Sequence, residues 1–189
     1  MGSEAFEAAF SNTIGHEGGF SDDPKDPGNW TDGVIGAGKL KGTKYGVSAM
    51  RYPERDIKAL TLEEAKEIYH RDWWLPLRCD ELPLSIALEL FDNAFNQGPM
   101  VAIMCLQWAC RFFGKNIAPD GRIGPATIAA AKTLDERALC AAQNWFQITT
   151  YVVGSKNVRA VVEYMRPFFI ARQEHVRRYI RGWLRRVDI

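Results

Sequence analysis

Near its start the chain reads Ile14-Gly15-His16-Glu17-Gly18-Gly19-Phe20, and polar, turn-rich sequence follows at once. Counted backwards from Glu17, apolar residues recur at spacings that place them on one face of an α-helix, namely Ile14, Phe10 and Phe6. The two glycines after Glu17 are typical of a helix end, because glycine adopts the left-handed conformation without strain. We therefore expect a helix over about 4–17, with Glu17 in its last turn and on the side facing the core.

This position would disfavour the charged form of Glu17. Partial burial and the negative end of the helix dipole both raise the pKa of a carboxyl group. A carboxylic acid that keeps its proton nearer neutral pH can serve as a general acid in catalysis. The alternative is that Glu17 is an ordinary helix residue and that the glycines only end the helix.

The following segments carry a family resemblance. After Glu17-Gly18-Gly19-Phe20 come Asp22-Asp23-Pro24-Lys25-Asp26-Pro27-Gly28 and then Thr43-Lys44-Tyr45-Gly46-Val47. These motifs resemble the catalytic half of glycoside hydrolase family 108, the N-acetylmuramidases of bacteria and phages within the lysozyme-like superfamily. The resemblance continues through 62–69, 73–83 and 91–98. Further on, Asp120–Thr127 resembles the motif of a peptidoglycan-binding domain, and Gly182–Val187 resembles the C-terminal signature of the family.

The resemblance implies a mainly α, lysozyme-like (α+β) fold: a helical bundle with one small β-hairpin beside the active-site cleft, then a helical C-terminal domain. The catalytic domain would span 1–98 and the peptidoglycan-binding-like domain 99–189. The activity implied is hydrolysis of the β-1,4 bond between N-acetylmuramic acid and N-acetylglucosamine in peptidoglycan strands. Glu17 would be the general acid, and Asp26 and Thr43 would position the attacking water. A lytic transglycosylase using Glu17 alone, or a non-catalytic wall-binding or secretion-helper protein, are the alternatives.

One segment departs from the family pattern. Many members run from Asp-Pro-Gly-Gly almost directly into Thr-x-Tyr-Gly, whereas residues 29–42 intervene here. Four glycines, with scattered apolar residues between them, favour an extended β-hairpin over this insertion. Because the insertion could re-aim the loop before it, Asp22 and Asp23 compete with Asp26 for the role of second carboxylate.

Three further residues are candidates for binding sugar. Tyr45 would share a strand face with Thr43 and stack on a sugar ring, although an aromatic residue in a short sheet more often packs against the protein. Asp92 and Asn96 lie four residues apart on an expected helix, where they would bind sugar hydroxyl or acetamido groups. Alternatively, these two are solvated or cap a neighbouring helix. Trp73 and Trp74 fit the core better than a sugar platform.

Helical patterns dominate the rest of the chain. Thr61-Leu62-Glu63-Glu64 is a capping box that begins a helix to about 72. Pro83 begins another helix, with an expected buried stripe at Leu84, Ala87, Leu88, Phe91, Ala94 and Phe95. Gly98-Pro99 ends it and marks the domain boundary. Further helices are expected over about 100–113, from Pro125, and over about 135–152 and 157–184, the last kinked at Pro167.

Composition limits the class of protein. The 189 residues are 47% hydrophobic and 25% charged, which is ordinary for a globular chain. No apolar run is long enough to span a membrane, and Glu4 and Glu7 oppose a signal peptide. We therefore expect synthesis in a bacterial or phage-infected cytoplasm, and action as a monomer in the periplasm or cell wall. Export would use a holin or a secretion apparatus.

Neither metals nor cofactors are indicated. The three histidines are scattered, and no two cysteines form a C-x-x-C pair, so a zinc site is disfavoured. Buried free thiols at Cys105 and Cys110 are favoured over disulfides. From Tyr151 onward nine Lys or Arg face three acidic residues. This excess fits a solvated helix face or attraction to anionic wall peptides or a membrane surface. No base-reading motif accompanies it, so nucleic acid is disfavoured.

Overall fold

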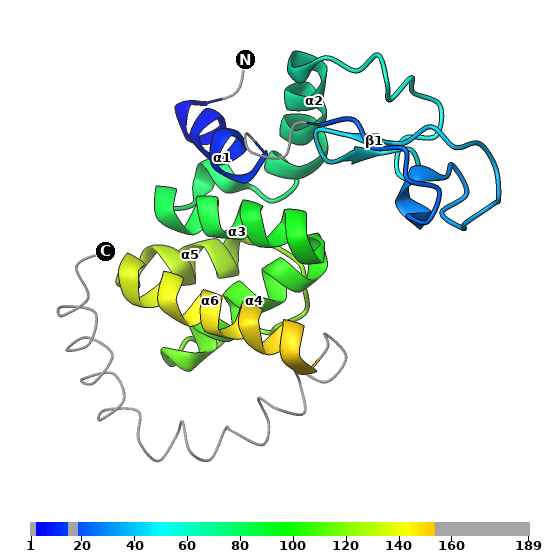
Figure 1. Cartoon of the computed structure of the whole chain (residues 1–189). Helices are drawn as coiled ribbons and strands as arrows, with labels where there is room; N and C mark the ends of the chain where they lie inside the picture. Colours follow the sequence, from blue (N-terminus) through cyan, green and yellow to red (C-terminus); the bar gives the residue numbers. More distant parts are fainter. Residues whose placement is uncertain (1–2, 15–18, 154–189) are drawn as a thin grey trace. The chain divides into compact units, whose positions relative to one another are not determined.

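The computed structural model describes residues 3–14 and 19–153. Glu17, the helix expected over 157–184 and its kink at Pro167 lie outside the described residues. The chain divides into two compact units, Met1–Trp73 and Trp74–Ile189, and each is considered by itself (Figure 1). No helix among the described residues is long and apolar enough to cross a membrane.

The first unit is built around two helices, α1 (Glu4–Ile14) and α2 (Leu62–Tyr69). The face of α1 expected from the sequence is buried, with exposed fractions of 1–2% at Phe6, Phe10 and Ile14. The ring of Tyr69 on α2 lies 5.9 Å from that of Phe10. A surface ion pair of 2.7 Å between the Lys66 ammonium and the Glu7 carboxylate also links the two helices. The predicted apolar stripe is therefore confirmed.

The start of α2 has the predicted capping box. The hydroxyl of Thr61 accepts a hydrogen bond of 3.2 Å from the amide of Glu64, and the Glu64 carboxylate accepts one of 2.8 Å from the amide of Thr61. Two amides that have no partner within the helix are thereby satisfied. Beyond Tyr69 the chain widens into a π-helical turn, η2 (His70–Trp74), so the α-helix ends earlier than expected. Trp73 and Trp74 are both buried, which confirms them as core residues.

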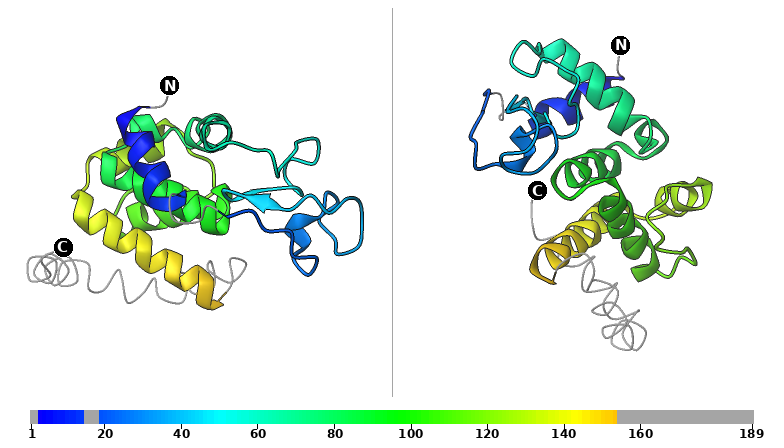
Figure 2. Two further views of the ribbon diagram at one scale, coloured as in Figure 1. Left: turned by 45° about the horizontal axis from the view of Figure 1, so that its top comes forward. Right: turned by 90° about the vertical axis from the view of Figure 1, so that its right-hand side faces the viewer.

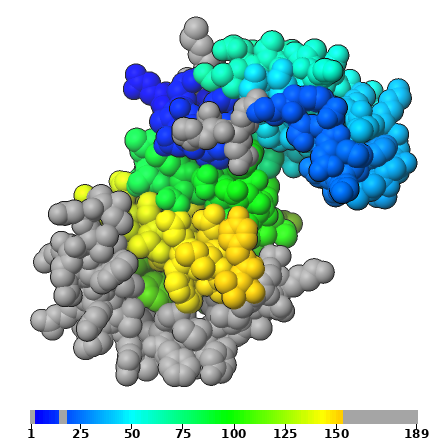
Figure 3. Space-filling view, in the orientation of Figure 1, coloured from blue at the N-terminus to red at the C-terminus, as the bar shows by residue number. Residues whose placement is uncertain are grey.

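The residues between α1 and α2 in the sequence form a lobe of loops, which is coloured blue to cyan in Figure 3. Its only two-stranded sheet among the described residues pairs β1 (Thr43–Lys44) with β2 (Val47–Ser48), antiparallel. Tyr45 and Gly46 connect these strands, and both have positive φ, of 51° and 73°. Positive φ at both positions is the geometry of the tight turn that matches strand twist in hairpins. The prediction that Tyr45 lies on a strand face with Thr43 is wrong, because Tyr45 is in the turn.

The insertion at 29–42 is not an extended hairpin either. One isolated bridge joins Trp30 to Leu40, and the residues between them form successive turns. Three glycines here adopt positive φ, which reverses the chain before a ladder can extend: Gly33, Gly36 and Gly38. The glycines that suggested a hairpin from the sequence are therefore what prevents a longer one.

The second unit is helical: α3 (Leu84–Gln97), α4 (Pro99–Phe112), α5 (Pro125–Lys132) and α6 (Glu136–Val153), after a short turn η3 (Cys79–Glu81). α3, α4 and α6 pack against one another (Figure 2). The predicted buried stripe on α3 is confirmed at Ala87, Phe91 and Ala94. Leu84 is 53% exposed, and Leu88 and Phe95 are only half-buried, so the stripe is wrong at these positions. Ile86 and Leu90 are buried instead, because α3 packs against two helices rather than one.

All four cysteines are free thiols, as expected for Cys105 and Cys110. Burial raises the pKa of Cys105 to about 11 and that of Cys110 to about 12. It raises the pKa of Cys140 to about 11 and that of Cys79 still further. Each thiol therefore stays protonated at neutral pH.

Candidate active site

Asp26 lies where the loop after α1 enters a short helical turn, η1 (Pro27–Asn29). Its Oδ1 accepts a hydrogen bond of 2.8 Å from the amide of Gly28, which makes Asp26 the N-cap of this turn. Asp before Pro suits this position, because Asp satisfies a free amide and Pro presets the first helical φ. The Asp26 side chain is exposed, so a carboxylate fixed by its own turn faces solvent.

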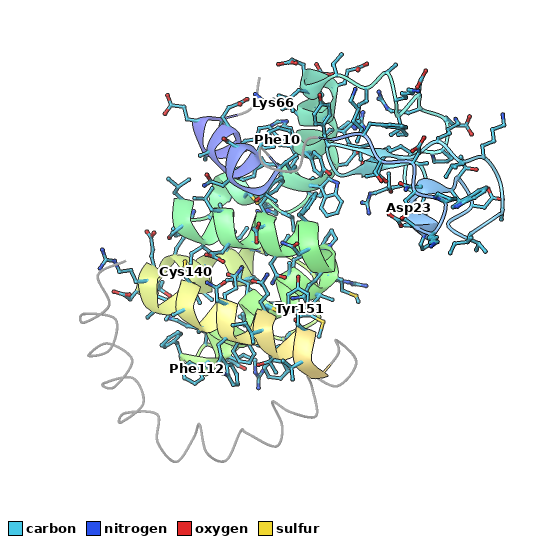
Figure 4. All side chains as sticks on the ribbon, viewed as in Figure 1. Phe10, Asp23, Lys66, Phe112, Cys140 and Tyr151 are labelled. Atoms are coloured by element: carbon cyan, nitrogen blue, oxygen red, sulfur yellow. The ribbon has the colours of Figure 1, made fainter. Side chains whose placement is uncertain are left out.

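The two rival carboxylates are held differently. Oδ1 of Asp23 accepts a hydrogen bond of 2.9 Å from the amide of Lys25, and the Asp23 carbonyl accepts one of 3.1 Å from the amide of Asp26. Asp23 thus shapes the loop that leads into η1, where Figure 4 labels it. Asp22 is exposed in the same loop.

Thr43 lies in β1 and pairs on both sides. Opposite Ser48 it belongs to the hairpin, and on its other side it exchanges two backbone hydrogen bonds with Ser21, of 2.8 and 2.9 Å. Ser21 directly precedes the aspartate loop. The structure therefore joins the loop of Asp26 and the strand of Thr43 in one lobe.

The backbone of Tyr45 is held by a hydrogen bond from a residue that the sequence did not indicate as functional. The hydroxyl of Tyr69, on α2, donates a hydrogen bond of 3.2 Å to the carbonyl of Tyr45. The Lys44 ammonium lies 5.3 Å from the centroid of the half-buried Tyr45 ring, within cation–π range. No local sequence signal indicated this contact, because Tyr69 and Tyr45 lie 24 residues apart in the chain.

A second missed cluster ties the segment after β2 to η2. Asp72 accepts a hydrogen bond of 2.9 Å from the Tyr52 hydroxyl, and the guanidinium of Arg71 donates two to its carboxylate, of 2.6 and 2.7 Å. The Arg71 guanidinium holds the pKa of Asp72 below its usual value, whereas burial raises the pKa of Tyr52. The Arg51 guanidinium lies 4.4 Å from the centroid of the Trp73 ring. These contacts hold the segment that follows β2 against η2.

Asp92 and Asn96 belong to α3 in the second unit. The Asn96 amide donates to the Asp92 carbonyl at 2.9 Å and to its carboxylate at 3.3 Å. The structure thus brings these two predicted residues together one helical turn apart, with the Asn96 side chain exposed. Their role in binding sugar stays a prediction.

The motif Asp120–Thr127 forms a turn organised by a buried amide on α4. Nε2 of Gln107 donates to Oδ1 of Asp120 at 2.9 Å and to the Arg122 carbonyl at 3.0 Å. Its Oε1 accepts a hydrogen bond of 2.9 Å from the amide of Gly121. Asp120 therefore helps to form this turn. Within the described part of the chain, no cluster of His, Cys, Asp or Glu could hold a metal ion.

A mainly α-helical chain with one small antiparallel hairpin in a loop-rich lobe has a lysozyme-like architecture. Residues 10–98 match the family model described as Glycosyl hydrolase 108, and residues 101–188 match that described as Predicted Peptidoglycan domain. The first half of the chain belongs to the glycosyl hydrolase 108 family, and the protein is a glycoside hydrolase. The two matched segments meet near Gly98, whereas the compact units divide at Trp73, so the division at 1–98 and 99–189 stays a prediction.

Among solved structures, the chain is similar to SagA of Brucella abortus. The two share 27% sequence identity, with a TM-score of 0.56, over 88% of this chain and 94% of the SagA chain. The similarity thus extends over nearly all of both chains. No curated protein matched this sequence.

Proposed function

We propose that the protein is an N-acetylmuramidase that hydrolyses the β-1,4 bond between N-acetylmuramic acid and N-acetylglucosamine in peptidoglycan. The observation that carries this proposal lies within the segment matched to glycosyl hydrolase 108. There, the exposed carboxylate of Asp26 is held by the amide of Gly28, in a loop tied through Ser21 to the strand of Thr43.

In the proposed mechanism, Glu17 donates its proton to the glycosidic oxygen, and positive charge develops on the sugar that is left. Asp26 and the hydroxyl of Thr43 hold a water on the opposite face of that sugar. Asp26 accepts a proton from this water as its oxygen bonds to the anomeric carbon, so the reaction inverts that centre. The two carboxyl groups would stand about 6.5–9.5 Å apart, which leaves room for the water.

The other predicted residues bind the strand. Tyr45 contacts a sugar ring, and Asp92 and Asn96 bind hydroxyl or acetamido groups. The second matched domain holds peptidoglycan and keeps the enzyme on its insoluble substrate. We propose that the enzyme acts as a monomer in the cell wall, as an endolysin or in secretion, and reaches the wall through a holin or a secretion apparatus.

The decisive experiment is mass spectrometry of the products that the full chain releases from purified peptidoglycan. A reducing-end muramic acid is expected. A 1,6-anhydro sugar would instead identify a lytic transglycosylase, and the absence of products would leave a wall-binding protein.

Glu17→Gln should lower turnover by about 10²–10⁴-fold, because the amide has no carboxyl proton to donate. Glu4→Gln is the matched control, since it makes the same change on an exposed residue of α1. Near-parental activity of Glu17→Gln would overturn the assignment of the general acid.

A further inference from the structure

Asn29 is the first residue of the insertion, and its backbone closes the insertion at its base. Its carbonyl accepts hydrogen bonds from the amides of Lys41, at 3.0 Å, and Gly42, at 3.1 Å. These are the last two residues of the insertion, and Thr43 follows them directly. The ends of the insertion therefore meet at Asn29, so its length does not separate the segments on either side.

The same residue also holds the aspartate loop. The amide of Asn29 donates a hydrogen bond of 3.1 Å to the carbonyl of Asp26. Its side-chain Nδ2 donates one of 3.0 Å to the carbonyl of Asp23, and the Asn29 residue is fully buried. The buried side-chain amide thus fixes the aspartate loop on Asn29, whose backbone carbonyl holds the end of the insertion, because breaking these bonds would leave polar groups unpaired.

We infer that Asn29 is a positioning residue for hydrolysis, which sets Asp26 and Thr43 relative to each other and keeps the insertion from displacing them. This inference rests on the proposed function. Asn29, which is buried, is hydrogen-bonded both to the loop of Asp26 and to the residues immediately before Thr43.

The hydrogen bonds of Asn29 are called the clasp below; its partners are Asp23, Asp26, Lys41 and Gly42. Close packing around the clasp supports a fixed geometry. Gly42 has φ +84°, and a Cβ there would lie 2.5 Å from the Ser21 carbonyl oxygen. The chain before Thr43 is thus packed directly on Ser21, the residue that leads into the aspartate loop. The amide of Met50, beyond β2, donates a further hydrogen bond of 3.1 Å to the carbonyl of Gly28.

The outer part of the insertion folds on itself. The amide of Thr31 donates to the Lys39 carbonyl at 3.0 Å, and the Thr31 hydroxyl accepts from the Lys39 amide at 2.9 Å. The amide of Gly33 donates to the Trp30 carbonyl at 3.0 Å. These bonds lie beyond the clasp, so changes to them should leave Asp26 and Thr43 in place.

Loosening the clasp has a specific chemical consequence. If Asp26 and Thr43 no longer hold a water, the sugar's own 6-hydroxyl can attack the anomeric carbon. Its oxygen forms the new bond, its proton passes to a base or to solvent, and the glycosidic oxygen leaves with the proton from Glu17. The product is a 1,6-anhydro sugar and no water is consumed, so the product ratio reports how well water is held.

The test compares Asn29→Ala with Thr31→Ala in the full chain on purified peptidoglycan. Asn29→Ala keeps the backbone hydrogen bonds to Asp26, Lys41 and Gly42 and loses the Nδ2 hydrogen bond that holds the carbonyl of Asp23. Because the aspartate loop then loses its attachment to a buried side chain, kcat should fall by about 10²-fold, as it does when catalytic groups are slightly misplaced, with KM nearly unchanged and a larger share of 1,6-anhydro product. Thr31→Ala, which loses two hydrogen bonds, both within the insertion, should keep the parental kcat and product ratio. A folded Asn29→Ala enzyme with parental kcat and product ratio would overturn the inference.

A second variant covers the case in which Asn29→Ala does not fold. Replacing residues 31–39 by two glycines keeps Asn29, Lys41 and Gly42, and should retain kcat within about threefold, because the clasp closes without the outer turns. Loss of activity or of fold in this variant would overturn the inference. A parent enzyme that releases no product would instead reject the proposed function, whereas activity in the parent with no difference among the variants rejects only the role of Asn29.

Discussion

The hydroxyl of Tyr69, at the end of α2, donates a hydrogen bond to the backbone carbonyl of Tyr45 in the turn between β1 and β2. A helix packed on α1 is thereby joined to the hairpin that carries Thr43. The turn needs such support, because Tyr45 adopts φ 51°, a conformation that is uncommon for a residue with a side chain.

Tyr69→Phe removes this hydrogen bond and keeps the ring that packs on Phe10. We expect the free energy of unfolding to fall by about 1 kcal/mol and kcat to fall more than KM changes. Thermal melts and steady-state kinetics on soluble peptidoglycan fragments would measure both. Tyr151→Phe, on the exposed part of α6, is the matched control and should change neither. Equal behaviour of the two variants would show that the turn does not depend on Tyr69.

Asp26→Asn and Thr43→Ala should each reduce turnover, while the fraction of protein that pellets with insoluble peptidoglycan stays unchanged. The loss should be larger for Asp26, about 10²-fold or more, because it both stabilises charge and accepts a proton. Asp22→Asn and Asp23→Asn make the same chemical change in the same loop and should leave more activity. Full activity of Asp26→Asn, with a loss at Asp22 or Asp23, would move the second carboxylate to that residue.

Gln107→Ala should destabilise the second unit by roughly 1–3 kcal/mol, because the turn at Asp120–Arg122 loses its buried partner. Thermal unfolding would measure this loss, and pelleting with insoluble peptidoglycan would show whether wall binding depends on the turn. Asp120→Asn keeps the acceptor Oδ1 and should be milder. If Asp120→Asn is as damaging as Gln107→Ala, the charge of Asp120 matters more than the amide.

Glu89 gives a prediction on pH. Burial raises the pKa of this half-buried carboxyl on α3, and the Asn144 side chain opposes the shift only in part. The folded-state pKa therefore lies above the unfolded one, so stability is greatest below the unfolded pKa and falls as pH rises through the folded pKa.

Glu89→Gln should consequently raise the melting temperature near neutral pH by a few degrees. The advantage over the parent should disappear below about pH 4, where both states of the parent are protonated. Glu54→Gln, at an exposed position, serves as the control. A variant that is less stable than the parent at neutral pH would contradict this reading of Glu89.

The elements that the sequence predicted well are those governed by local signals. The apolar spacing from Phe6 to Ile14 specified the buried face of α1, and the capping box at Thr61 placed the start of α2. The buried stripe of α3 was harder to predict from the sequence, because burial there depends on α4 and α6, which pack on two sides of the helix. The π-helical turn η2 has no comparable local signal.

For the candidate site, sequence motifs indicated which residues take part but not which other residues hold them in place. Asp-Pro-Gly placed Asp26 as the N-cap of a short turn, which follows from local chemistry. The contacts of Asn29 with Lys41 and of Tyr69 with Tyr45 join residues far apart in the chain, so no spacing rule could reveal them. The glycines of the insertion were misinterpreted for a related reason, since the sequence does not show that all four take positive φ and turn the chain.

The buried thiols have a practical consequence for handling the protein. Oxidation and alkylation proceed through the thiolate, and the raised pKa of each of the four thiols keeps it protonated. Cys79, Cys105 and Cys110 are also buried, whereas Cys140 is partly exposed. The folded enzyme should therefore withstand air, peroxide and maleimide reagents without an added reductant. A new cysteine introduced on its surface would then be the preferred site for a fluorescent label, with no need to remove the native ones.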